Sequence, residues 1–144
     1  MRENIRIAGV QMNVEIAETE QNLVKIFEAM KTAAGEGADL AVFPECALTG
    51  YCFQDLQEAR AYAQLVPGPF TERLEKKCQE FNIHIIVGML EYEGDQVYNT
   101  AAFIAPNGVV GHYRKIHLPY LGIDRFLTPG DRPFEVYDSE VGQV

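Results

Sequence analysis

Cysteine is scarce in this sequence, and its arrangement argues against two common uses of the residue. The chain contains three cysteines, at positions 46, 52 and 78. Their number is odd and no two of them form a Cys-x-x-Cys pair. Neither a disulfide framework nor a zinc site is therefore favoured.

Positive charge and long apolar runs are scarce as well. Twelve Lys and Arg residues are outnumbered by 21 Asp and Glu residues, which gives a formal net charge of −9. This excess of acid argues against a nucleic-acid or anionic-membrane surface. No apolar run reaches the roughly 18–20 residues of a transmembrane helix, and the N-terminal run is too short and too polar at its flanks for a signal peptide. We expect a cytoplasmic protein without nucleic-acid or membrane partners.

Internal repeats and linkers are not seen either. The 144 residues, 47% of them hydrophobic, can build the core of one domain. We interpret residues 1–144 as a single domain.

The first 45 residues follow the order strand, helix, strand. Residues 5–12 are nearly continuously apolar after Arg6, which is typical of a strand covered on both faces. Thr19 is a plausible N-cap, and apolar residues then recur at helical spacing (Leu23, Ile26, Phe27, Met30 and Ala34). Residues 38–43 predict a second short strand, ended by Pro44. This order predicts an α/β fold with a parallel pair of strands.

The middle of the chain predicts two helices and a hairpin. We expect helices over residues 55–65 and, from the spacing of its apolar residues, over 70–81. Strand 83–92 follows. Strands 97–105 and 109–115 pair through Pro106-Asn107-Gly108, because Asn-Gly tolerates the positive φ of a primed turn.

The end of the chain predicts one short strand, over residues 134–137, and then the beginning of another at 141–144. A strand that stops at its first residues would leave edge groups of a sheet unpaired. Either these residues are a tail or the chain is a fragment of a longer protein, and we expect the second.

Glu45 directly follows an apolar strand and a proline, so it should lie partly buried at the C-terminal end of that strand. Open parallel sheets place their ligand crevice there. Desolvation would raise the pKa of such a carboxylate and suit it to general-base work. The alternative is a glutamate in a solvated turn or a helix-capping role.

Lys115 ends another apolar strand pattern. Strand-end lysines usually point into water, and Arg114 beside it supports that interpretation. A buried lysine next to a carboxylate would instead stabilise a developing oxyanion. Alternation places His117 on the same face as Lys115 if the strand persists that far, where a local hydrogen bond that orients the loop is its expected role.

The cysteines offer no clear nucleophile. Cys46 adjoins Glu45, but adjacent side chains on an extended segment point apart, so packing is the better interpretation. Cys78 lies on the apolar face of its predicted helix and should be in the core. Cys52 lies in a loop and stays undecided.

Four blocks of the sequence together resemble a known family. The first is residues 7–12, and the second is residues 37–51, which contain Phe43-Pro44-Glu45. The third runs from Tyr98-Asn99-Thr100 through Gly108 to Tyr113-Arg114-Lys115-Ile116-His117-Leu118-Pro119, and the fourth is Thr128-Pro129-Gly130-Asp131. In these residues and in this order, the chain resembles the carbon–nitrogen hydrolases, also called the nitrilase superfamily.

This resemblance implies an α-β-β-α sandwich with a Glu-Lys-Cys triad that hydrolyses an amide, carbamoyl or nitrile group through an acyl-enzyme. Glu45 would be the general base and Lys115 would stabilise the tetrahedral intermediate. Small-molecule substrates and a homo-oligomer are implied, with no metal and no organic cofactor.

The chain departs from the family pattern in two places. The nucleophilic cysteine of the family is expected a short way beyond the Pro-Gly turn, past the last residues of this sequence. The chain therefore resembles the N-terminal half of a member, and we expect it to be inactive alone. Many members carry an additional glutamate before that turn. The nearest match is Asp124, one position out of register from Gly130, and either it substitutes or the role is absent.

Two alternative functions stay open. The first is a truncated, non-catalytic binding or assembly module from a split or decayed gene, since half of a layered fold exposes apolar surface that needs a partner. The second is a glutaminase-like domain that feeds ammonia to a larger synthetase.

Overall fold

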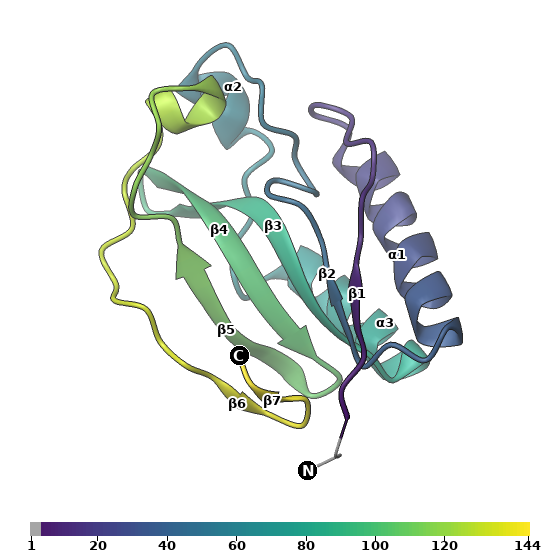
Figure 1. The fold of residues 1–144 in the computed structure, drawn as a ribbon. Coiled ribbons are helices and arrows are strands. Elements are labelled where there is room, and N and C mark those ends of the chain that lie inside the picture. Colours follow the sequence, from purple (N-terminus) through teal and green to yellow (C-terminus); the bar gives the residue numbers. More distant parts are fainter. Residues whose placement is uncertain (1–3) are drawn as a thin grey trace.

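A single five-stranded sheet organises the protein, whose computed structural model describes residues 4–144 (Figure 1). Its strands lie in chain order: β1 (Ile7–Gly9), β2 (Leu40–Val42), β3 (His84–Glu93), β4 (Gln96–Ala105) and β5 (Gly108–Arg114). β1, β2 and β3 run parallel, and β4 and β5 continue the sheet antiparallel. The predicted parallel pair and the predicted α/β class are therefore confirmed.

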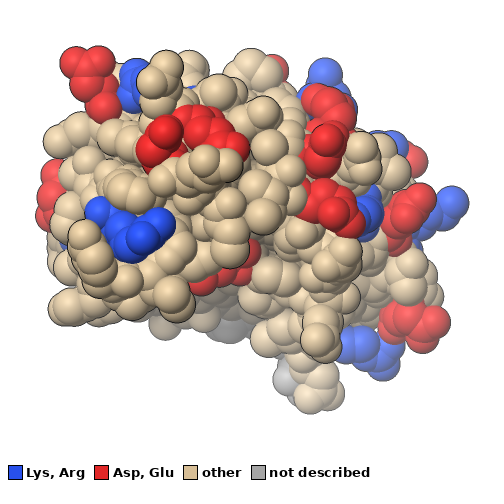
Figure 2. Space-filling view, turned by 90° about the horizontal axis from the view of Figure 1, so that it is seen from above, with Lys and Arg blue, Asp and Glu red and all other residues tan. Residues whose placement is uncertain are grey.

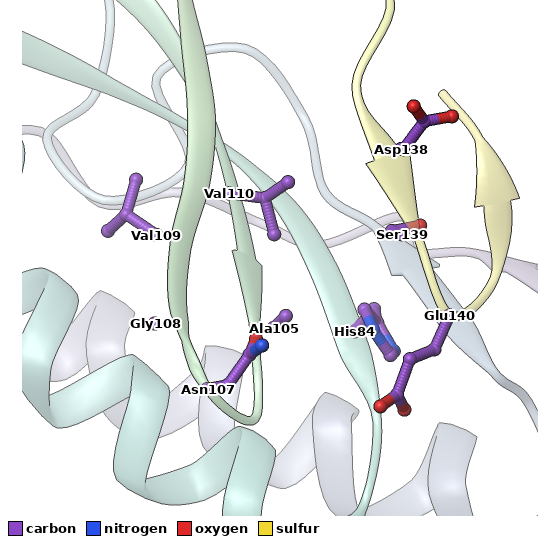
Figure 3. A pocket seen from close by; sticks show the side chains of 9 residues that line it. All are labelled: His84, Ala105, Asn107, Gly108, Val109, Val110, Asp138, Ser139 and Glu140. Carbon is purple, nitrogen blue, oxygen red and sulfur yellow. The ribbon is translucent and has the colours of Figure 1, made fainter.

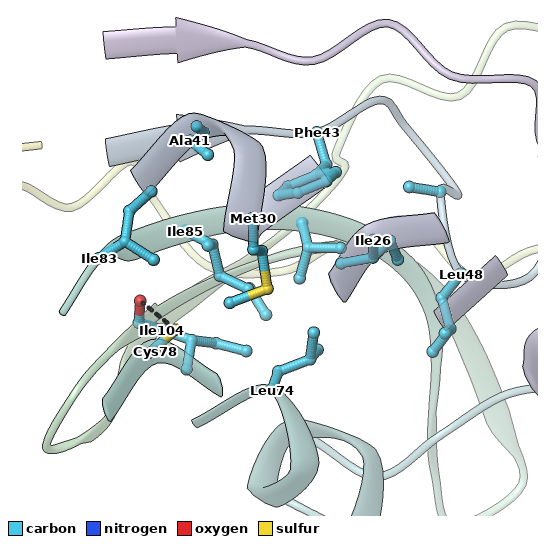
Figure 4. Close-up of a cluster of buried hydrophobic side chains, with 14 of the residues drawn as sticks. Ile26, Met30, Ala41, Phe43, Leu48, Leu74, Cys78, Ile83, Ile85 and Ile104 are labelled. Atoms are coloured by element: carbon cyan, nitrogen blue, oxygen red, sulfur yellow. Dashed lines mark hydrogen bonds between the residues drawn. The ribbon is translucent and has the colours of Figure 1, made fainter. Parts of the chain in front are cut away.

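Two helices, α1 (Thr19–Gly35) and α3 (Pro69–Phe81), pack together on one face of this sheet (Figure 1). The side chains between these helices and the sheet form the main core (Figure 4), among them Ile26, Met30, Phe43, Leu74, Cys78, Ile85 and Ile104. Because strand side chains alternate, the neighbours of these core residues face the other side of the sheet. A short helix, α2 (Leu56–Arg60), lies near the opposite end of the sheet from the β4–β5 turn.

The last segment of the chain crosses the sheet face that lies opposite the helices. Phe134 stacks on Tyr113 of β5 with ring centroids 5.1 Å apart, and the Tyr137 ring lies so close to Gly111 that a side chain there would clash. The segment ends in a small antiparallel pair, β6 (Asp138–Ser139) and β7 (Gly142–Gln143). None of the helices in the described part of the chain is long and apolar enough to cross a membrane.

The predicted first strand is wrong in length and in burial. β1 spans three residues, and the Ile7 residue is 62% exposed, because β1 is the edge strand and the helices cover only one of its faces. Thr19 is the first residue of α1, after an N-cap at Glu18 that makes no side-chain cap, so the predicted capping role of Thr19 is also wrong.

The helix predicted over residues 55–65 is shorter than expected. It begins after Asp55, whose carboxylate accepts a hydrogen bond from the Glu58 amide at 2.8 Å, and it ends at Arg60. The chain then turns so that Gln64 can pair with Glu91 on β3. The helix predicted over residues 70–81 is confirmed as α3.

The β4–β5 hairpin is confirmed, but its turn differs from the prediction. Pro106 and Asn107 occupy the two turn positions, and only Gly108 has a positive φ, of 125°. The pyrrolidine ring fixes a negative φ at Pro106, which excludes a primed turn with positive φ at both positions. The register of the same strand pair shifts between Phe103 and Ile104.

The strand predicted over residues 134–137 is wrong. Its aromatic residues hold an extended segment against the sheet by side-chain packing, and regular pairing begins only where Tyr137 and Val144 exchange backbone hydrogen bonds of 2.8 and 3.0 Å. The predicted strand at 141–144 is present in part, as β7.

Candidate active site

Three of the four predicted site residues meet at one end of the sheet. Glu45 follows β2, Lys115 follows β5, and Asp124 lies in the short 3-10 helix η1 (Gly122–Arg125). The Lys115 Nζ atom is 2.7 Å from Glu45 Oε1 and 2.6 Å from Asp124 Oδ2. Segments far apart in the sequence thus place one cation between two carboxylates.

A tight turn holds Glu45 against β3. The turn closes through backbone hydrogen bonds within residues 44–50, and Cys46 takes a positive φ of 48° in it. Gly88 of β3 lies directly beneath, because a Cβ there would approach the Pro44 carbonyl oxygen and the Cys46 nitrogen to 2.5 Å. The absence of a side chain at Gly88 therefore lets the Glu45 turn reach the sheet.

Backbone contacts on both sides hold Lys115. Its amide donates to the Asn99 carbonyl at 2.8 Å, and its own carbonyl accepts from the Gly130 amide at 2.9 Å. The Pro-Gly turn predicted from the sequence therefore packs on the end of β5. Arg114 points to the opposite side of the strand, where it is 4% exposed and pairs with the buried Glu91.

Asp124 differs from Glu45 in its surroundings. Its side chain is fully buried and both of its oxygens accept hydrogen bonds: Oδ1 from Asn99 at 2.9 Å, and Oδ2 from Lys115 and from the Tyr51 hydroxyl at 3.1 Å. The side chain of Glu45 is 48% exposed. The two carboxylates that pair with Lys115 therefore differ in exposure: Asp124 is buried and Glu45 is half exposed.

Lys115 stays charged in this setting. Burial alone would lower the pKa of its ammonium group, but the hydrogen bonds with Asp124 and Glu45 outweigh burial and raise that pKa above its ordinary value. Burial and the hydrogen bond to Asp124 likewise raise the pKa of Tyr51 to about 12, so its hydroxyl remains a donor.

His117 does not join the cluster. β5 ends at Arg114, and His117 is exposed, with no hydrogen bond to any described residue. The strand does not persist to His117, so the condition for a shared strand face is not met. The predicted local hydrogen bond of His117 is not found among the described residues.

Two of the three cysteines are packing residues, as predicted. Cys46 is fully buried, and burial together with the Glu45 and Asp124 carboxylates raises the pKa of its thiol far above the ordinary range. Burial raises the pKa of Cys78 to about 12. Cys52 is exposed.

A cleft of about 250 Å³ opens beside the Glu45–Lys115 pair. Its remaining lining is mainly apolar, from Phe43, Ile86, Ala101 and Tyr113 among others. A larger cleft of about 470 Å³ lies at the other end of the sheet, beside the β4–β5 turn (Figure 3). It holds His84, Asp138 and Glu140 but no lysine or arginine, so the chemistry favours the smaller cleft as the site.

Charged side chains of both signs are exposed at one end of the molecule (Figure 2). Acidic side chains are spread over the end of the molecule seen in Figure 2, and the basic ones on this face occur in small separate groups. Among residues 4–144, no group of three or more His, Cys, Asp or Glu side chains could hold a metal ion.

Asn99, Gly88 and Tyr51 were not predicted as site residues. Asn99 and Tyr51 stand within the recognised blocks, and a polar Asn99 in the apolar β4 pattern is the signal that could have identified it. Nothing in the sequence pairs Gly88 with the Glu45 turn.

The chain resembles known proteins in sequence. The sequence model of the Carbon-nitrogen hydrolase family matches residues 6–144. A nitrilase from Pyrococcus abyssi is 39% identical over 93% of this chain and 51% of its own length. A glutamine-dependent NAD(+) synthetase from Thermotoga maritima is 30% identical over 97% of this chain and 24% of its own.

A solved structure shows the same fold. The amidase from Nesterenkonia sp. superposes with a TM-score of 0.77 at 24% identity, over 96% of this chain and 52% of its own. The chain thus spans about half the length of that amidase and of the nitrilase, and less of the synthetase.

The matched segments and the fold define a nitrilase-type α/β domain. The chain belongs to the carbon-nitrogen hydrolase family.

Proposed function

We propose that this chain supplies the general base and the cationic group of an enzyme that hydrolyses a non-peptide carbon–nitrogen bond in a small amide, carbamoyl or nitrile substrate. The observation that carries the proposal is the placement of Lys115 Nζ between Glu45 and Asp124 beside an apolar cleft. Membership of the family supports the reaction class.

The two carboxylates take different roles in this proposal. Asp124 is buried and its two oxygens are both occupied, so it serves as a fixed counter-charge that holds Lys115 in place. Glu45 is half exposed at the cleft and serves as the general base. Lys115, charged throughout, stabilises the tetrahedral intermediate and favours a nearby thiolate.

The proposed reaction follows from these roles. A thiol gives its proton to Glu45, and the thiolate attacks the substrate carbon. With an amide or carbamoyl substrate, the tetrahedral intermediate expels ammonia or an amine, which takes the proton from Glu45, and a thioester is left. With a nitrile, the substrate nitrogen takes that proton and a thioimidate forms, which adds one water before ammonia leaves and the same thioester results. Water, deprotonated by Glu45, releases the acid and restores the thiol.

The nucleophile in this proposal is a cysteine outside the 144 residues. Cys46 and Cys78 are buried, and their raised thiol pKa values keep them protonated. Cys52 is exposed but does not line the cleft. We propose that residues 1–144 are one part of a single hydrolase domain and are inactive on their own.

Mass spectrometry tests this assignment. The complete gene product, incubated with a simple amide and quenched with acid, should carry the acyl group on a cysteine other than Cys46, Cys52 and Cys78. An acyl group on one of these three, or ammonia release by the purified 144-residue chain, would show that the nucleophile is misassigned. Cys46→Ser would then be the first variant to examine.

A glutaminase-like unit of a larger synthetase is a second candidate. The similarity to the Thermotoga maritima synthetase favours it. Ammonia release from glutamine, together with a synthetase region in the gene product, would support this role. A gene product without such a region would exclude it.

Exposed apolar side chains favour an assembly role as a third candidate. Phe134, Val136 and Tyr120 are 79%, 71% and 88% exposed. Concentration-dependent association, or co-purification with a second polypeptide, would support a module that needs a partner, and the same surface is compatible with a homo-oligomer.

A further inference from the structure

Asn99 stands at the centre of the site without being one of the groups that the proposed reaction uses. It lies on β4 opposite Leu90 of β3, it is 4% exposed, and it lines the same cleft as Glu45 and Lys115. Its carbonyl also receives the backbone hydrogen bond that fixes Lys115. Both its main chain and its side chain therefore belong to the site.

The side-chain amide of Asn99 links the two carboxylates. Its Nδ2 atom donates one hydrogen bond to Glu45 Oε1 at 2.6 Å and another to Asp124 Oδ1 at 2.9 Å. Its Oδ1 atom lies 3.7 Å from the Cys46 sulfur, within reach of a weak thiol hydrogen bond. This surrounding fixes the orientation of the amide, because the reversed group would turn its oxygen toward two anions.

This linkage determines which oxygen of Glu45 is free. Lys115 and Asn99 both donate to Oε1, and no described residue donates to Oε2. The carboxylate is therefore held by one oxygen while the other remains available for proton transfer at the cleft.

The amide also compensates for a shortage of positive charge. Two carboxylates share the single ammonium group of Lys115. The two N–H groups of Asn99 give each anion one more donor without adding charge.

We propose that Asn99 is a positioning residue, which holds Glu45 by one oxygen and fixes it relative to Asp124. This inference rests on the proposed function, since it concerns the base of that reaction. It goes beyond it by assigning a task to a side chain that takes no part in the chemistry.

Kinetics of the complete gene product test this role. Asn99→Ala should lower kcat for ammonia release by roughly 10- to 100-fold with little change in KM. The loss is expected in kcat because Lys115 alone then holds Glu45, which is no longer fixed in the geometry that proton transfer needs. A kcat within a few-fold of the wild type, or a loss that appears in KM alone, would overturn the inference.

A matched control separates this effect from simple loss of stability. Thr71 is another buried polar residue, at the start of α3, whose hydroxyl accepts a hydrogen bond from the Gly68 amide and donates one to the Gly68 carbonyl, both at 2.8 Å. Thr71→Ala should destabilise the fold and leave kcat of the folded protein close to the wild-type value. An equal fall of kcat in folded Thr71→Ala would contradict a specific role for Asn99.

Two further measurements keep the test decisive if Asn99→Ala does not fold. Asn99→Ser keeps one donor and should give a smaller loss of kcat. The NMR signals of the Asn99 side-chain amide protons should move in Glu45→Gln and in Asp124→Asn, because each substitution changes one acceptor of the amide. Amide signals that move in neither variant would count against the linkage.

Glu45→Gln distinguishes the two proposals. If Glu45→Gln keeps wild-type activity, the proposed function is wrong. If Glu45→Gln is inactive while Asn99→Ala keeps the wild-type kcat, only the positioning role is wrong.

Discussion

Gly88 and Glu45 lie in direct contact although one belongs to the interior of β3 and the other to a turn after β2. A Cβ atom at Gly88 would come within 2.8 Å of the Glu45 Cα atom and within 2.5 Å of the two neighbouring peptide groups. The neighbouring atoms are backbone, so they cannot move aside as a flexible side chain would. Glu45, the proposed base, can thus take this position only because residue 88 has no side chain.

Gly88→Ala should therefore displace the Glu45 turn. We expect a loss of about 1–3 kcal/mol in the free energy of unfolding, the usual cost of overpacking, and a severe loss of hydrolysis in the complete gene product. Denaturant unfolding and ammonia release measure the two effects. Gly9→Ala is the control, because nothing lies within 4 Å of a Cβ there. Equal effects of the two substitutions would contradict this account of Gly88.

The sequence predicted the core of the fold because the signals for it are local. The helix α3 and strands β3 to β5 follow from periodicity and from Pro106-Asn107-Gly108, and Glu45 and Lys115 follow from strand ends and family blocks. Whether both faces of a strand are covered depends on segments that are distant in the sequence, so the exposure of Ile7 was not predicted. The role of Gly88 in the site depends on a contact between distant segments, which no spacing rule reveals.

The Glu91–Arg114 pair gives a second prediction, on stability. Glu91 and Arg114 are almost fully buried, and Thr100 donates to Glu91 at 2.7 Å. Glu91→Ala leaves the guanidinium buried without its main partner and should reduce the free energy of unfolding by roughly 3–5 kcal/mol. Denaturant unfolding measures the loss.

Glu93 provides the control for that prediction. It contacts the same arginine at 3.0 Å, but its side chain is 63% exposed and water can replace it. Glu93→Ala should change stability little. A loss as large as that of Glu91→Ala would argue against burial as the cause.

The buried His84 and the partly buried His112 predict a loss of stability in mild acid. Burial lowers the pKa of His84 and of His112 below the ordinary value, although Glu140 and Glu91 respectively act in the opposite direction. The unfolded chain, with a histidine pKa of about 6.5, then binds protons that the folded chain does not. The free energy of unfolding should therefore fall as the pH drops from about 7 to about 5.

A double variant, His84→Gln with His112→Gln, tests this origin. The fall in stability over the same pH interval should be smaller than in the wild type, because neither side chain can then take up a proton. Denaturant unfolding at several pH values measures it. An equally steep fall in the double variant would place the effect on other groups.

The thiols predict a graded reactivity. Cys52 is exposed, whereas Cys46 and Cys78 are buried with raised pKa values. A thiol reagent should label Cys52 rapidly in the native protein and label the other two only on unfolding. Peptide mapping by mass spectrometry identifies the labelled residue, and Cys52→Ser should remove the rapid label. Rapid native labelling of Cys46 would show that its surroundings open more than the structure indicates.

The central claim is that Glu45 and Lys115 form the catalytic pair, and ammonia release by the complete gene product tests it most directly. Glu45→Gln and Lys115→Met should each lower kcat/KM by roughly 1000-fold or more, since each removes a charge that acts on the reacting atoms. Lys25→Met is the control, because Lys25 forms a partly exposed ion pair with Glu15 at 3.3 Å away from the site, and it should retain wild-type activity. Activity of Glu45→Gln or Lys115→Met within a few-fold of the wild type would contradict the account.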